Sequence, residues 1–151
     1  MRLSKLLAAA LVAVPVLASA AEITGTFKVS AEVKPACSVS ATDVVVATYD
    51  PTAAAATKET GTISVACTKK TAYKTGLTSA NGWTLKGTGT DVLKYQIFQG
   101  ATTTPWNDVS IWGATSTGKA AVGYTATVSI DPQQDVAVDV YADTVTVHVN
   151  Y

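Results

Sequence analysis

Two segments of the chain alternate strictly between apolar and polar residues, one near each end. The first runs from Ile23 to Val33, and the second from Asp143 to Tyr151. A period of two predicts extended strands with one face meant for burial. The apolar face of the first consists of Ile23, Gly25, Phe27, Val29, Ala31 and Val33. The apolar face of the second consists of Val145, Val147, Val149 and Tyr151.

The sequence between these segments predicts further short strands joined by turns. Turn residues occur at Tyr49-Asp50-Pro51 and Ala80-Asn81-Gly82, and a loop is expected over Gly113 to Lys119. The alanines within Thr52 to Lys58 are too few for a stable helix. The strands are expected at Val33 to Val39, Val44 to Thr48, Gly61 to Thr68, Tyr73 to Ser79, Trp83 to Lys86, Val92 to Phe98 and Val122 to Ile130. Such a set predicts an all-β sandwich.

The first twenty residues have the features of a secretory signal peptide. Arg2 and Lys5 precede an apolar run from Leu6 to Leu17, and Ala18-Ser19-Ala20 provides the small residues that a signal peptidase accepts. The run is shorter than the roughly 20 apolar residues of a transmembrane helix. We therefore expect residues 1–20 to be removed, so that the exported chain begins at Ala21.

Charge and composition narrow the classes of partner. Removal of Arg2 and Lys5 leaves nine of the eleven Lys and Arg residues against eleven Asp and Glu residues. This balance predicts no binding to nucleic acid and no insertion into a membrane. The roughly 130 residues that remain suffice for one domain with a core.

Cys37 and Cys67 are the two cysteines of the chain. Export places them in an oxidising compartment, where an even pair is most simply a disulfide. The alternation of Gly61 to Thr68 also directs Cys67 inward, opposite Cys37. Closing a loop of about 30 residues stabilises a fold by roughly 3 to 4 kcal/mol in the chain-entropy model.

Residues that commonly serve as catalytic bases or nucleophiles are scarce. The one histidine, His148, alternates with the valines of the last strand and is expected to face away from the core. Asp135, Asp139 and Asp143 recur in β-like sequence, are expected to face solvent, and lack the spacing of an EF-hand. We predict a protein that is not an enzyme and that has no cofactor and no metal site.

The three tryptophans leave two interpretations open. If Trp83, Trp106 and Trp112 were exposed together, they would form an aromatic platform for sugars in a secreted binding module. Packing into the sandwich core is the commoner role of such residues.

The segment from Ile23 to Val33 also leaves two interpretations open. It lies directly upstream of the strand that carries Cys37, with no turn that would let it fold back. Either Ile23 to Val39 is one long strand, or the first half leaves the domain and pairs elsewhere. Typical strands are shorter than the first option requires, and an apolar strand without a partner is an aggregation hazard.

A series of motifs in a fixed order and spacing covers nearly the whole exported chain. They are the alternating segment with Gly25, then Cys37-Ser38-Val39, Tyr49-Asp50-Pro51, Gly61 to Thr68, Leu93 to Phe98, Trp106, Gln134 to Val138 and Tyr141 to Tyr151. In these motifs the chain resembles the spore coat protein U domain family, which includes the pilin subunits of the archaic, Csu-type chaperone–usher pili of Gram-negative bacteria. Two positions depart from the family pattern. Asp139 stands where a glycine is usual, and the glycine often found near the Tyr-Asp-Pro turn is absent.

The resemblance implies an immunoglobulin-like sandwich that lacks one strand. A periplasmic chaperone would fill the open groove first, and at the outer-membrane usher the extension of the next subunit would replace it. Residues 21–31 would be this donor-strand extension and residues 32–151 the pilin domain. The donor side chains would be Ile23, Gly25, Phe27, Val29 and Ala31, with Phe27 as the main anchor.

The resemblance also implies partners and a location. Val145, Val147, Val149 and Tyr151 would pair with the chaperone or with the next subunit, which would be a copy of this chain or a homologous pilin. The protein would pass through the periplasm to the cell surface and serve adhesion and biofilm formation as part of a pilus. The alternatives are a secreted carbohydrate-binding adhesin module and a structural protein of a spore coat.

Overall fold

A computed structural model describes residues 20–109 and 111–151. Contacts between residues divide the chain into two units, the first ending at Glu32 and the second running from Val33 to Tyr151. In the first unit, residues 20–32 form neither helix nor strand, and their side chains are exposed. The predicted signal peptide, residues 1–20, lies outside the described residues except for Ala20. The described residues form no helix with the length and apolarity that a bilayer crossing demands.

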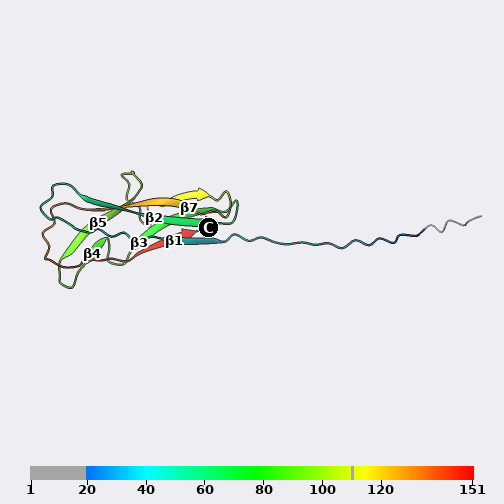
Figure 1. The fold of residues 1–151 in the computed structure, drawn as a ribbon, viewed down its shortest axis with the longest axis horizontal. Helices are drawn as coiled ribbons and strands as arrows, with labels where there is room; N and C mark the ends of the chain where they lie inside the picture. The colour runs from blue at the N-terminus through cyan, green and yellow to red at the C-terminus, as the bar shows by residue number, and fades with distance from the viewer. Residues whose placement is uncertain (1–19, 110) are drawn as a thin grey trace, which may run out of the picture. The chain divides into compact units, whose positions relative to one another are not determined.

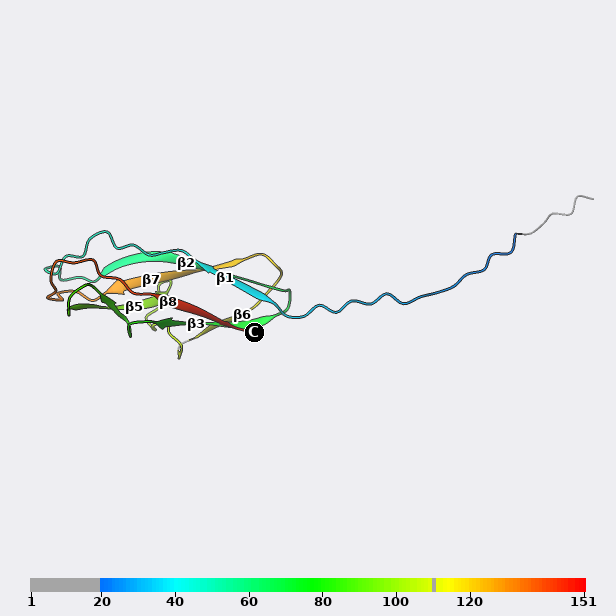
Figure 2. The same ribbon diagram turned by 90° about the horizontal axis from the view of Figure 1, so that it is seen from below.

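The second unit is a sandwich of two antiparallel sheets (Figure 1). One sheet has the strand order β1-β2-β7-β5-β4, and the other has the order β6-β3-β8. Figure 2 shows the layer of β2 and β7 above that of β3 and β6. The strands are β1 (Cys37–Ala41), β2 (Thr57–Cys67), β3 (Ala72–Ser79), β4 (Thr84–Lys86), β5 (Val92–Gln99), β6 (Trp112–Thr115), β7 (Val122–Ile130) and β8 (Val145–Asn150). The predicted all-β, immunoglobulin-like class is confirmed.

Alternating residues of the inner strands form the core between the sheets. On β2, the inward positions Ile63, Val65 and Cys67 are buried, while their neighbours Thr62, Ser64 and Ala66 are not. The largest fully buried side chain is Trp106, which reaches the core from the loop after β5. Its Nε1 donates a hydrogen bond to the Thr75 carbonyl at 3.1 Å, so burial leaves this polar group satisfied.

A disulfide and the Tyr49 hydroxyl fasten the connections of the sandwich. Cys37 and Cys67 stand opposite each other in the β1–β2 pairing and form the predicted disulfide. The Tyr49 hydroxyl donates to the Asp131 carbonyl at 2.9 Å and accepts from the Gln134 N–H at 2.9 Å. The β1–β2 connection is thereby tied to the end of β7.

The prediction of a strand at Val44 to Thr48 is wrong. Backbone pairing of β1 with β2 ends when the Thr42 N–H donates to the Thr62 carbonyl at 3.0 Å. Val44 then lies over Gly61, where an added Cβ would come within 2.6 Å of Val44 Cγ2. Val44 and Val46 therefore pack against the core while Val45 is exposed, and the backbone of the segment forms no ladder.

The boundaries of β6 and β2 also differ from the sequence prediction. The expected loop from Gly113 begins as β6, because Gly113 pairs with Lys74 and fits against the Tyr73 carbonyl. β2 begins at Thr57, inside the alanine-rich stretch, because Thr57 pairs with Ile130 at the end of β7. In both places long-range pairing overrides the local composition.

Candidate functional site

The two sheets each end in a strand with one unpaired edge on the same side of the sandwich. β1 pairs with β2, and β8 pairs with β3. β1 and β8 approach each other, yet within the described residues they form no ladder with each other, and each has a paired strand on one side only. In Figure 2, β1 (cyan) and β8 (red) belong to the two different layers. Backbone N–H and C=O groups along such edges are available to a further strand.

Side chains beside these two edges are only partly covered. Val147 is half-buried, although Leu77, its partner on β3, is 0% exposed. Val39 of β1 is 42% exposed, whereas Val65, its partner on β2, is 1% exposed. We call this partly covered apolar strip the open edge; its members are Val39, Val145, Val147 and Val149. It offers apolar side chains and unpaired backbone to an incoming strand.

The predicted donor residues show the complementary property. Ile23 is 96% exposed and Phe27 is 88% exposed, and Val29 and Ala31 are exposed as well. Nothing lies within 4 Å of a Cβ built on Gly25. Residues 20–32 thus carry an alternating apolar face that is uncovered throughout.

Asp143 fixes the start of β8, the strand that carries most of the open edge. Its carboxylate accepts hydrogen bonds from the Tyr95 hydroxyl at 2.6 Å, from Ser79 Oγ and from the Asn81 N–H at 3.1 Å. Burial raises the pKa of Tyr95, and the hydrogen bond to Asp143 raises it further. This phenol therefore stays protonated and acts as a donor. The expectation that Asp143 faces solvent is wrong, because it is half-buried in this network. Asp135 and Asp139 are exposed as predicted.

Near its other end, β8 makes one polar side-chain contact with β3. His148 is exposed, as predicted, and its Nε2 lies 2.7 Å from Thr78 Oγ1 on the neighbouring strand. Tyr151 follows the end of β8 and is exposed, although its three companion valines are half-buried. The polar face of β8 is therefore solvated, while its apolar face lines the open edge.

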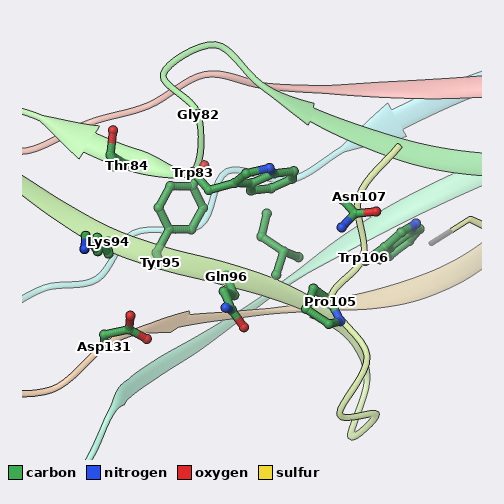
Figure 3. Close-up of a pocket in the computed structure, with 11 residues that line it drawn as sticks. Gly82, Trp83, Thr84, Lys94, Tyr95, Gln96, Pro105, Trp106, Asn107 and Asp131 are labelled. Carbon is green, nitrogen blue, oxygen red and sulfur yellow. The ribbon is translucent and has the colours of Figure 1, made fainter. Parts of the chain in front are cut away.

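Two of the tryptophans, Trp83 and Trp106, line a pocket of about 360 Å³ beside β4 and β5 (Figure 3). The Trp83 ring meets Tyr95 edge-on, with centroids 5.9 Å apart, whereas Trp106 is 0% exposed and belongs to the core. Trp112 is half-buried, and its Nε1 has no hydrogen-bond partner. The structure therefore supports the core interpretation for Trp106 and shows no platform of three exposed tryptophans. No group of three metal-ligating side chains occurs in the part of the chain that the structure describes.

Sequence reasoning identified the β8 valines but missed Val39. The signal was present, because Cys37, Val39 and Ala41 alternate along β1 and pair with Cys67, Val65 and Ile63. Sequence reasoning also missed Asp143 as an anchor, since its partners Ser79 and Tyr95 are far from it in the chain.

Comparisons with known proteins give matches of two kinds. The family model of the spore coat protein U domain matches residues 23–148. Among solved structures, a similar chain belongs to the crystal structure of the CsuC–CsuE chaperone–tip adhesion subunit pre-assembly complex from archaic chaperone–usher Csu pili of Acinetobacter baumannii. The identity is 27% and the TM-score 0.61; the match covers 79% of this chain and 40% of that chain. The present chain thus spans less than half the length of that relative. A search of curated proteins returned no significant match.

Proposed function

We propose that this chain, which belongs to the spore coat protein U domain family, is a structural subunit of a chaperone–usher pilus that polymerises by donor-strand exchange. The family is a structural one, and the chain is not an enzyme. In the proposed fibre, residues 21–31 of one copy occupy the open edge of the next copy or of a homologous pilin. The pilin domain, residues 32–151, receives a strand in the same way.

One observation carries this proposal: Val147 and Val149 of β8 are only half-covered, while Leu77 and Thr75, their partners on β3, are fully buried. A sandwich with a complete set of strands would cover the valines of β8 as well as their partners on β3. The alternating face of residues 23–31 supplies the type of side chain that would complete it. Its exposure in the described chain supports a role in pairing with another molecule rather than with its own domain.

The energetics of strand insertion are favourable. Burying the apolar donor side chains at roughly 1.5 to 3 kcal/mol each gives a gross gain on the order of 10 kcal/mol. Phe27, the largest of them, is the main anchor. Gly25 adds no side chain, so a neighbouring residue or backbone of the acceptor can approach the donor closely there. Main-chain hydrogen bonds along the edge fix the register.

The direction of the inserted strand also follows from the domain. Every strand pair in it is antiparallel, and antiparallel pairing is slightly the more stable kind. We therefore place the donor antiparallel to β8. The donor then leaves the acceptor at the end where β8 begins, beside Val145.

The same proposal includes the partners and the location. A periplasmic chaperone covers the open edge until assembly and pairs with Val145, Val147, Val149 and Tyr151. An outer-membrane usher then exchanges it for the next subunit. The fibre reaches the cell surface of a Gram-negative bacterium and serves adhesion and biofilm formation.

The decisive test is expression of the chain with and without residues 21–31 together with a cognate chaperone. The full chain is expected to form fibres visible by negative-stain electron microscopy, and the truncated chain to accumulate as a chaperone complex. Fibres from the truncated chain would show that assembly does not proceed through this segment.

A further inference from the structure

Lysines gather at the end of the sandwich where β1 begins and β8 ends. Four of them line one pocket of about 650 Å³: Lys34, Lys69, Lys70 and Lys119. All four are exposed, and within the described residues none forms an ion pair. Exposed Val33 and Tyr151 also line the pocket and add apolar surface. We call this region the basic end.

Carboxylates gather at the opposite end, where β7 ends and β8 begins. The register places the two ends apart, since β7 begins opposite Val65 and ends opposite Thr57. The Ala137 N–H donates to Asp91 at 2.9 Å, which joins the β4–β5 turn to the segment after β7. The carboxylates of this acidic end are Asp50, Asp91, Asp131, Asp135, Asp139 and Asp143. Lys58, Lys86 and Lys94 also lie there, and the six carboxylates outnumber them, so the excess is negative.

The side chains of the acidic end confirm that these groups lie together. Desolvation, together with the nearby charges of Asp91 and Asp139, raises the pKa of Tyr141. Val138 and Val140 flank Asp139 and are among the most exposed apolar side chains of the domain. The segment from residue 135 to residue 140 therefore presents carboxylates and apolar side chains together. The basic end presents ammonium groups and apolar side chains together.

We infer that the basic end of one copy docks onto the acidic end of the next copy, with the segment 135–140 received by the lysine pocket. This inference rests on the proposed function. A donor strand antiparallel to β8 leaves the acceptor beside Val145, at the acidic end. The donor chain continues directly into its own Val33 and Lys34, which belong to its basic end. The opposite strand direction would bring two basic ends together.

The docking gives the polymer a second contact besides the donor strand. Complementary charges steer the encounter of two copies, and like charges disfavour the reversed orientation. The contact also limits the angles that successive subunits can adopt. Its contribution is expected to depend strongly on salt, because the charges are exposed.

The test uses two variants of the full exported chain, residues 21–151. Each variant reverses two charges, one variant at the basic end and the other at the acidic end of the sandwich. The basic-end variant is Lys69→Glu with Lys119→Glu, and the acidic-end variant is Asp131→Lys with Asp135→Lys. Oligomer formation by the purified chain is followed in about 20 mM and about 300 mM NaCl, where the screening length falls from about 20 Å to about 6 Å. Each variant is expected to assemble about 10-fold more slowly than the wild type in low salt, and within about 2-fold of it in high salt. An equimolar mixture of the two variants is expected to recover most of the rate.

A matched control separates docking from net charge. Lys58→Glu with Lys86→Glu changes the charge by the same amount as the basic-end variant, but at the acidic end, and is expected to assemble at least as fast as the wild type in low salt. Equal rates for wild type and both end variants in low salt would overturn the docking and leave donor-strand exchange standing. If the wild type forms no fibres, the proposed function fails, and sedimentation of the purified chains in low salt then tests the docking as a reversible association. A wild type as monomeric as its variants would overturn it.

Discussion

The centre of the sandwich and its open edge use the same alternation of valine-rich strands but differ in coverage. On β2 and β7, Val65 and Ile130 are both 1% exposed, because strands flank them on both sides. On β8, the valines have a neighbour on one side and stay half-buried. The difference shows that an alternating pattern specifies which face is apolar, whereas the neighbouring strand decides whether that face is buried. A missing neighbour converts core sequence into a binding surface.

The largest expected effect comes from the strand proposed to close the open edge. Phe27→Asp places a charge where the proposed donor would bury its anchor, and burying an unpaired carboxylate is strongly unfavourable. We expect loss of fibres with the chaperone complex intact, measured by electron microscopy and by co-purification. Thr26→Asp is the matched control, because Thr26 lies on the opposite face of the same segment. If Phe27→Asp assembled as Thr26→Asp does, the apolar face would not be the one inserted.

A smaller effect distinguishes the two members of one cross-strand pair. Leu77 and Val147 stand opposite each other, but Leu77 is fully buried and Val147 is not. Leu77→Ala is expected to lower the free energy of unfolding by about 2 to 5 kcal/mol, and Val147→Ala by about 1 kcal/mol or less. The measurement is urea unfolding of monomers that carry Phe27→Asp.

Adding a peptide of residues 21–32 with the native sequence sharpens this contrast. The proposed strand would bury Val147, so the cost of Val147→Ala is expected to rise with the peptide, while that of Leu77→Ala stays nearly constant. Equal costs for the two substitutions without peptide would contradict the assignment of Val147 to an open edge.

The smallest effect concerns a hydroxyl pair in the closed part of the sandwich. The Tyr73 and Tyr124 hydroxyl oxygens lie 2.6 Å apart, and burial followed by this contact raises the pKa of Tyr124 to about 12. The folded state therefore holds a proton that the unfolded state releases near pH 10, so this contribution to stability is complete below about pH 10 and is lost between about pH 10 and pH 12. Unfolding measured by circular dichroism across this range is expected to depend less on pH in Tyr124→Phe. An unchanged dependence would exclude Tyr124 as its source.

The local sequence pattern predicted a strand correctly where the segment also pairs with a neighbour in the sheets. The predicted strand Val122 to Ile130 has the same two boundaries as β7. The predicted last strand agrees with β8 to within two residues at each end. Val44 to Thr48 has the same β-branched composition but pairs with no strand, so its sequence could not reveal that it is a connection. Gly113 was read as a loop residue, although its lack of a side chain is what allows β6 to lie against Tyr73.

The candidate site was predictable in part for a related reason. The apolar faces of residues 23–31 and of β8 follow directly from alternation, and so does the inward direction of Cys67. The role of Val39 depends on β1 lying at the rim of its sheet, and the role of Asp143 depends on Ser79 and Tyr95 converging on it. These are properties of the assembled sheets, and a period of two residues contains no information about them.

The position of the disulfide has a mechanical consequence for the proposed fibre. Tension on a fibre would enter each subunit from residues 21–32 and reach β1 at its first residue, Cys37. A strand pulled from its end would otherwise peel away from its neighbour one hydrogen bond at a time. The bond to Cys67 passes the load directly to β2, which lies inside the sheet between β1 and β7. The ladder between β1 and β2 is thus relieved of the load, and a reduced fibre is expected to yield at lower force than an oxidised one.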